Sequence, residues 1–185
     1  MNLAQEITEG LTQWTLENNG HELVRDYIGL SQCALSIEEI VNSKLNGFPV
    51  GEDQLRKFYK GHQMEADLLR RLRIRIGDRV QPGGEIVAFG GRVKGHPDFL
   101  FDGYPGDCKS VPLDEHIPQR RGLPRRVFWQ MQGYMLFAPA QRSVVVYESR
   151  ETGVIQAFDL FPVISIQREI QQKMAQVLGR LEGTE

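Results

Sequence analysis

The sequence has few cysteines and no long hydrophobic run. Cys33 and Cys108 are the only two cysteines in 185 residues, which excludes a disulfide framework or a four-cysteine metal site within the chain. A reducing cytosol is the simplest compartment for such a chain. No run of about 18 apolar residues is present, and the acidic first residues do not resemble a signal peptide. We therefore expect a cytoplasmic protein with no membrane partner.

An excess of charge of one sign is also lacking. The chain carries 22 basic and 24 acidic residues, a formal net charge of −2, so its total charge does not point to a nucleic-acid partner. Basic residues nevertheless gather over 56–75, and arginines without an acidic neighbour gather over 119–126. Such runs are either solvated surfaces or contacts for phosphate groups. The remaining composition, 41% hydrophobic and 25% charged, is that of a globular protein.

Hydrophobic spacing predicts an α/β fold, with a mixed central sheet flanked by helices and preceded by an N-terminal helical region. We expect helices over 3–17, after a Ser36–Glu39 capping box, over 52–75 and 125–137, and from 162 onward. Strands are expected over 85–89, 93–101, 106–111, 143–148 and 153–160. The length favours one domain, 1–185, divided into a helical region (1–50), a core (52–160) and a C-terminal helix (162–185).

A short hairpin is expected to bring two aspartates together. Asp102–Gly103 has the composition of a two-residue hairpin turn, and that turn places Asp98 directly across from Asp107. Cross-strand partners have Cβ atoms about 4.5–5.5 Å apart, and two carboxylates at this distance repel each other. A divalent cation between them would turn the repulsion into a ligand set. The alternative is that both aspartates are ordinary residues beside a turn.

Strand alternation places Lys109 on the same face as Asp107, whereas the side chain of Cys108 points to the other face. An ammonium group beside a metal bound by carboxylates can stabilise an attacking hydroxide or a phosphorane-like transition state. This arrangement therefore suggests metal-dependent phosphoryl chemistry. A surface lysine without a chemical role is the alternative.

The long helix over 52–75 contributes two polar residues to an apolar stripe. His62 and Glu65 share a helix face with four apolar residues, Leu55, Phe58, Leu69 and Leu72. This face should be turned toward the core. A buried carboxylate is costly unless it is paired or bound to metal, so Glu65 is a candidate metal ligand. His62 is a second candidate, for which a hydrogen-bonded core histidine is the simpler explanation.

Several of these residues together resemble a known family. Gln130 and Tyr134, four residues apart, share one face of the helix over 125–137. The residues Pro97-Asp98, followed by Asp107-x-Lys109, resemble the PD-(D/E)xK nuclease motif. The segments 61–65 (GHQME) and 130–134 (QMQGY) resemble helix motifs of its RecB-like and lambda-type exonuclease branch. The order of elements also fits the restriction-endonuclease-like αβββαβ core of that superfamily.

The resemblance implies a metal site. One or two Mg²⁺ or Mn²⁺ ions would bind Asp98, Asp107 and the backbone carbonyl of Cys108. Glu65 would complete the site directly or through water, while the role of His62 is open because it lies three residues before the family's position. Some relatives carry an iron–sulfur cluster held by four cysteines. The C-terminal cysteines of that pattern are missing here, so we expect no iron–sulfur cluster.

The resemblance also implies roles in catalysis and DNA binding. Lys109 would position and activate the attacking water, and Gln130 and Tyr134 would hold the DNA strand or the lysine. The arginines near the predicted site would contact phosphates with salt-dependent affinity; these are Arg120, Arg121, Arg125 and Arg126.

The implied function is metal-dependent hydrolysis of DNA by an exonuclease acting at DNA ends. Its setting would be recombination, repair or phage DNA processing, in a bacterial or phage-infected cell. DNA is the expected partner, together with a second copy of the chain or a recombination protein. Three alternatives stay open: a structure-specific endonuclease, a non-catalytic nucleic-acid-binding module on the same fold, and an unrelated α/β domain with a chance Asp-x-Lys.

Overall fold

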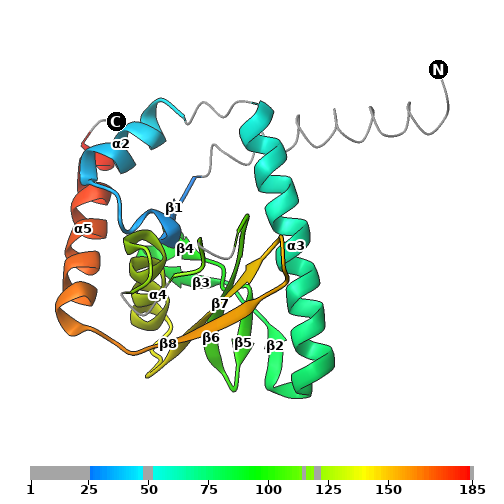
Figure 1. Ribbon diagram of the computed structural model, residues 1–185. Helices are drawn as coiled ribbons and strands as arrows, with labels where there is room; N and C mark the ends of the chain where they lie inside the picture. The colour runs from blue at the N-terminus through cyan, green and yellow to red at the C-terminus, as the bar shows by residue number, and fades with distance from the viewer. Residues whose placement is uncertain (1–25, 48–51, 114–115, 119–121, 184–185) are drawn as a thin grey trace.

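The computed structural model describes residues 26–47, 52–113, 116–118 and 122–183, with the backbone alone for 52–60 and 62. Figure 1 shows the predicted mixture of helices and strands. The helices are α2 (Ile37–Leu45), α3 (Glu52–Ile76), α4 (Arg125–Phe137) and α5 (Ile164–Glu182). The strands are β1 (Ile28–Gly29), β2 (Val80–Pro82), β3 (Ile86–Ala88), β4 (Val93–Gly95), β5 (Phe99–Phe101), β6 (Tyr104–Val111), β7 (Ser143–Ser149) and β8 (Ile155–Leu160).

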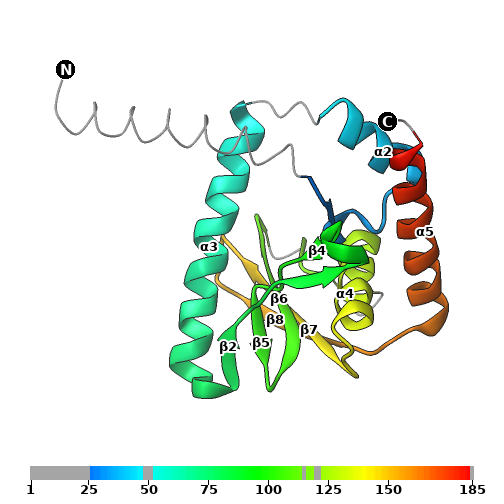
Figure 2. The ribbon, with the colours of Figure 1, turned by 180° about the vertical axis from the view of Figure 1, so that it is seen from behind.

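The central sheet has five strands in the order β2-β5-β6-β7-β8. β6 and β7 are parallel and are joined by α4, whereas the other neighbouring pairs are antiparallel. The sheet is therefore mixed and lies between helices, which confirms the predicted fold class. A smaller sheet in the order β1-β4-β3 lies on the same side of the molecule as α4 (Figure 2).

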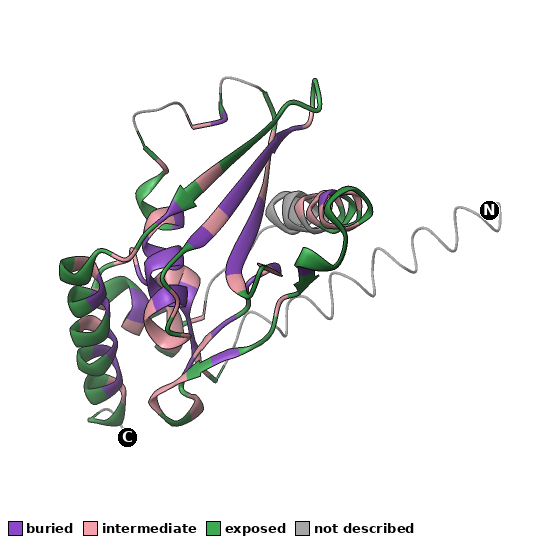
Figure 3. Ribbon diagram, turned by 90° about the horizontal axis from the view of Figure 1, so that it is seen from below, coloured by how far each residue is buried: buried purple, intermediate pink, exposed green. Residues whose placement is uncertain are grey.

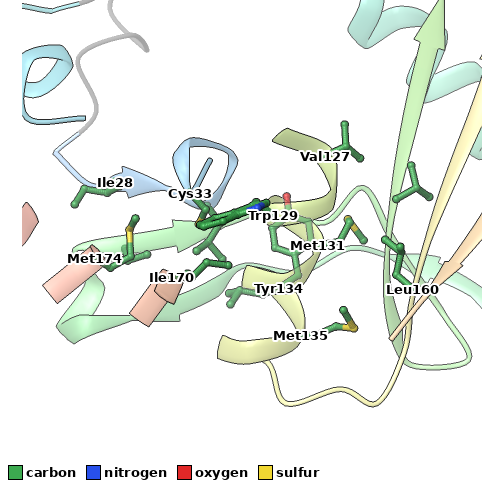
Figure 4. Close-up of a cluster of buried hydrophobic side chains, with 14 of the residues drawn as sticks. Ile28, Cys33, Val127, Trp129, Met131, Tyr134, Met135, Leu160, Ile170 and Met174 are labelled. Atoms are coloured by element: carbon green, nitrogen blue, oxygen red, sulfur yellow. The ribbon is translucent and has the colours of Figure 1, made fainter. Parts of the chain in front are cut away.

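Helices cover both faces of the central sheet (Figure 3). α3 packs on one face, where a small apolar core contains Leu68, Val80, Phe99, Cys108 and Val146. α4 packs on the other face and is itself covered by α5. The larger core lies around α4, with Trp129, Ile170 and Met174 among its members (Figure 4).

The helix predictions largely match the structure. α4 has the predicted bounds, and α2 begins at a capping box in which Ser36 and Glu39 exchange hydrogen bonds of 2.7 and 3.2 Å. The helix expected over 3–17 lies outside the described residues. Among the residues that the structure describes, no helix is long and apolar enough to cross a membrane.

The strand predicted over 93–101 is wrong as a single element. It is split into β4 and β5, which belong to different sheets, and the break falls at His96–Pro97. Proline has no N–H to donate to a sheet, and Gly83 approaches this break so closely that a Cβ there would lie 1.7 Å from the carbonyl oxygen of Pro97. The short strand β2, which the sequence analysis missed, pairs with β5.

Candidate functional site

The β5–β6 hairpin has the register that its turn predicts. Phe101 pairs with Tyr104 and Phe99 with Gly106, and both residues of the Asp102–Gly103 turn have positive φ, 50° and 84°. Two positive φ values are typical of the type I′ turn, whose twist matches that of the flanking strands. The turn thus fixes which residues of β6 lie beside the start of β5.

Asp98 continues this hairpin just before β5 begins. Its backbone N–H donates to the carbonyl oxygen of Gly106 at 3.0 Å. Its side-chain Oδ2 accepts a hydrogen bond from the backbone N–H of Cys108 at 2.6 Å. The carboxylate of Asp98 therefore lies against the peptide that follows Asp107, as the proposed pairing requires.

Asp107 is the most deeply buried carboxylate of the site, at 2% exposure. Its Oδ2 lies 2.5 Å from the Nζ of Lys109, which confirms that these two side chains share a face of β6. Its Oδ1 accepts a hydrogen bond of 3.3 Å from the Nε2 of Gln130 on α4. Both oxygens of this carboxylate thus have a partner of positive or partly positive charge.

Burial and mutual repulsion disfavour the simultaneous ionisation of Asp98 and Asp107. Burial, with the charge of Asp107 next, raises the pKa of Asp98 to about 7 from 3.8. Burial also raises the pKa of Asp107, although Lys109 opposes the shift. Burial alone would lower the pKa of Lys109, but the charges of Asp107 and Asp98 outweigh it and raise that pKa. The site therefore favours a bound positive charge.

Glu65, on α3, adds negative charge to the surroundings of this site. It is half-buried, and its charge contributes to the raised pKa values of Asp98, Asp107 and Lys109. The side chain of His62 lies outside the described residues. Within the described part of the chain, no group of three or more His, Cys, Asp or Glu side chains is assembled as a ready metal cage.

The donor chemistry nevertheless fits a hard divalent cation. The buried carboxylate of Asp107 and the half-buried carboxylate of Asp98 disfavour each other's ionisation, and carboxylate oxygens are the ligands that Mg²⁺ and Mn²⁺ prefer. The thiol of Cys108 does not belong to this set, because it is fully buried among apolar side chains on the α3 face. Burial raises the pKa of that thiol, so only the main chain of Cys108 borders the site. Its carbonyl as a ligand stays a prediction.

The Gln130–Tyr134 pair connects Asp107 to the segment before Asp98. Gln130 Nε2 also donates to the Tyr134 hydroxyl at 2.6 Å, and that hydroxyl donates to the carbonyl oxygen of His96 at 3.0 Å. Tyr134 is 2% exposed, and a Cβ on Gly95 would lie 2.7 Å from its ring. The pair thus lies on one helix face, as predicted, and ties the backbone at His96–Pro97 to the carboxylate of Asp107.

The predicted DNA contacts fall partly within the described chain. Arg125 and Arg126 are exposed in the first turn of α4, whereas Arg120 and Arg121 lie outside the described residues. The guanidinium of Arg125 lies 4.7 Å from the ring centre of Trp129, and the ammonium of Lys173 lies 4.3 Å from it. Two cations therefore lie over the ring of Trp129.

Two further residues of this region were missed by the sequence analysis. Glu148 on β7 is buried and accepts hydrogen bonds of 2.6 Å at both oxygens from Arg71 of α3. Tyr147 lies opposite Lys109 across the β6–β7 pair. A glutamate at the end of an apolar strand, two residues after three valines, was the available signal for the first. Nothing in the sequence gave the parallel register that places the second.

No protein-family model matches this chain, and no curated protein matches it in sequence. Its fold is shared with solved exonuclease structures. An alkaline exonuclease (LHK-Exo) from Laribacter hongkongensis gives a TM-score of 0.68 at 17% identity, over 91% of this chain and 93% of that chain. LHK-Exo in complex with dAMP gives 0.63 at 18% identity, over 86% and 89%. A phage-related exonuclease from Haemophilus somnus 129PT gives 0.62 at 12% identity, over 82% and 91%.

At these identities the likeness concerns the fold alone. This chain shares the fold of these alkaline and phage-related exonucleases, and the exonuclease-like fold expected from the sequence motifs is confirmed at this level. The match extends over nearly the whole length of each exonuclease.

Proposed function

We propose that this chain is a metal-dependent deoxyribonuclease, an exonuclease that hydrolyses phosphodiester bonds at DNA ends during recombination, repair or phage DNA processing. The observation that carries the proposal is the meeting of Asp98, Asp107 and Lys109 at one end of the hairpin, with 2.5 Å between Lys109 Nζ and Asp107 Oδ2. The shared fold with alkaline and phage-related exonucleases supports it. The dAMP complex of LHK-Exo supports a nucleic-acid substrate.

The carboxylates would hold the cation. Asp98 and Asp107 are its ligands, with Glu65 and the carbonyl of Cys108 as further oxygen donors. A bound Mg²⁺ or Mn²⁺ supplies Lewis-acid polarisation of the phosphate and a water of lowered pKa. His62 is kept as a further candidate ligand.

The other residues would position substrate and water. Lys109 keeps its ammonium beside Asp107, where its charge stabilises the developing negative charge of the attacked phosphate. Gln130 orients Asp107 through its hydrogen bond and, with Tyr134, would hold the DNA strand or Lys109. The arginines of the 120–126 segment contact the phosphates next to the cleaved bond.

The experiment compares end-labelled linear DNA with closed circular DNA in the presence of Mg²⁺, Mn²⁺ or EDTA. The test variant is Asp107→Asn, which removes the buried charge and keeps the shape. The matched control is Asp102→Asn, in the turn of the same hairpin. Asp102 is exposed and pairs with Arg79 at 2.5 Å, an ion pair of a kind that contributes little to stability, and asparagine also tolerates its positive φ.

We expect metal-dependent loss of linear DNA only, abolished in Asp107→Asn and retained in Asp102→Asn. Cleavage of the circle would favour an endonuclease instead. A wild-type protein that binds Mn²⁺ without cleaving would indicate a nucleic-acid-binding module. Equal cleavage by Asp107→Asn and wild type would refute the assignment of the site.

A further inference from the structure

Tyr147 lies next to Lys109 on the neighbouring strand. The parallel β6–β7 register pairs Lys109 with Tyr147 and Asp107 with Val145. Neighbouring strands are about 4.8 Å apart, and paired residues direct their side chains to the same face of a sheet. The phenol of Tyr147 and the ammonium of Lys109 therefore share the α4 face, on which Asp107 also lies.

The hydroxyl of Tyr147 is buried without a hydrogen-bond partner among the described residues. The residue is 3% exposed, and its ring packs edge-on against Phe158 with the ring centres 5.8 Å apart. A phenylalanine would make the same ring contact without the cost of burying an unpaired hydroxyl. Packing alone therefore does not account for a tyrosine at this position.

The charges around the phenol suit it as a hydrogen-bond acceptor. Burial raises the pKa of Tyr147 to about 12, with Lys109 lowering it and Asp107 raising it in addition. The phenol is thus neutral at ordinary pH, and its oxygen can accept a hydrogen bond. An ammonium group has three N–H donors, of which the contact with Asp107 Oδ2 occupies one.

A second acceptor becomes necessary when the carboxylates bind a cation. Asp107 is both the partner of Lys109 and a proposed metal ligand, so a divalent cation competes with the ammonium for the same carboxylate. Without another acceptor, a flexible lysine side chain would leave its position beside the reacting phosphate.

We propose that Tyr147 is a positioning residue of this site, whose phenol oxygen accepts a hydrogen bond from Lys109 and keeps the ammonium in place while a divalent cation engages Asp107. The inference rests on the proposed nuclease function, because it assigns a role to Lys109 during cleavage. The contact between Lys109 and Tyr147 in the cation-bound protein can be tested without DNA cleavage.

The test variant is Tyr147→Phe, which removes one oxygen atom and keeps the ring. Because that hydroxyl has no hydrogen-bond partner among the described residues, the melting temperature should stay unchanged or rise. Cleavage should fall about tenfold in kcat with KM unchanged, the size expected for one hydrogen bond to a charged group. Tyr104→Phe, at the beginning of β6, is the matched control and should keep the wild-type rate.

A second readout follows Lys109 without DNA. The protein is pulse-labelled with an amine-acylating reagent, with and without saturating Mn²⁺, and Lys109 is quantified by peptide mass spectrometry with Lys94 as internal reference. Without Mn²⁺ the two proteins should label Lys109 equally, because Asp107 holds it in both. With Mn²⁺, labelling should be several-fold faster in Tyr147→Phe than in wild type.

Equal labelling with Mn²⁺, or a wild-type kcat in Tyr147→Phe, would overturn the proposal. A fall in melting temperature of several degrees would also contradict it, since the hydroxyl would then stabilise the metal-free fold. If wild-type protein binds Mn²⁺ but cleaves no DNA, the proposed function fails, while the labelling comparison still decides the contact between Lys109 and Tyr147.

Discussion

The two faces of β6 differ sharply although their residues alternate along one strand. Asp107 and Lys109 point toward α4, where they meet Gln130 in a buried polar network. Cys108, between them, points toward α3 and packs with Leu68 and other apolar side chains. Two adjacent residues of β6 therefore differ in the effect of burial. Burying the carboxylate of Asp107 is unfavourable, whereas burying the side chain of Cys108 is favourable.

The two faces of the sheet differ in how the charge of a buried carboxylate is compensated. On the α4 face, burial raises the pKa values of Asp98 and Asp107, so the folded protein holds these carboxyls at a cost. On the α3 face, the buried carboxylate of Glu148 is balanced by Arg71. On the α4 face, Lys109 and Gln130 compensate the cost only in part, since the pKa values stay raised, and such a perturbed pair of carboxyls is typical of a ligand-binding or catalytic site.

Gln130→Ala is the strongest test of the polar face. It removes the hydrogen bond that orients Asp107, so cleavage should fall by about 10²–10³-fold, on the order of 3–4 kcal/mol in the barrier. The measurement is single-turnover cleavage of linear DNA with saturating Mg²⁺. A rate within about twofold of wild type would show that the network does not orient the carboxylate.

The control for this variant lies two residues further along α4. Gln132 is fully buried, donates to the carbonyl oxygen of Phe161 and accepts from the N–H of Val163, both at 2.8 Å. Gln132→Ala should therefore lower the free energy of unfolding by about 2–3 kcal/mol and leave the cleavage rate of the folded protein unchanged.

Arg71→Met tests the compensated carboxylate of the other face. It leaves Glu148 buried without its partner, and we expect a loss of about 2–3 kcal/mol in the free energy of unfolding, measured in urea. Arg71 is partly exposed, so the loss should be smaller than the roughly 3–5 kcal/mol expected when a fully buried ion pair loses one partner. The double variant with Glu148→Gln should recover part of it. Full stability of Arg71→Met would mean that the two faces do not differ as argued.

Asp98→Asn tests the cost of ionising the Asp98 carboxyl in the folded protein, through the pH dependence of the free energy of unfolding. The folded-state pKa of about 7 lies above the ordinary 3.8, so wild-type stability is lost as pH rises through this window, once the metal is removed with EDTA. The variant, which cannot ionise, should equal wild type near pH 4 and exceed it by on the order of 2 kcal/mol at pH 8. Urea unfolding at both pH values measures this, and a constant difference would contradict the raised pKa.

Local rules were sufficient to predict the hairpin and its two aspartates. The Asp102–Gly103 turn specifies a twist and a register by itself, and i,i+4 spacing places Gln130 and Tyr134 together on α4 without knowledge of the rest. The prediction failed at 93–101, where alternation continued through Pro97 and concealed a change of sheet. Proline was the signal, and its missing N–H is the reason for the break.

The remaining features depend on contacts between distant segments. The parallel pairing of β6 with β7 is set only after α4 has packed on the sheet, so the neighbourhood of Lys109 and Tyr147 has no local signature. The same holds for Arg71 and Glu148, which come from α3 and β7. Sequence spacing identified the residues on each element, while tertiary packing decided which elements would meet.

Cys108→Ala should have the smallest effect, and it tests whether the α3 face of β6 can change without affecting the α4 face. The variant removes a buried sulfur from the α3 face, so we expect a loss of about 1 kcal/mol in the free energy of unfolding. The hydrogen bond from the backbone N–H of residue 108 to the Asp98 carboxylate is kept, and the replaced side chain faces away from Asp107. Cleavage and Mn²⁺ affinity should therefore match wild type. Urea unfolding and cleavage assays on the same preparation measure both quantities. A cleavage rate that falls more than about twofold would show that the two faces of β6 are coupled, and the chemistry could then not be assigned to the α4 face alone.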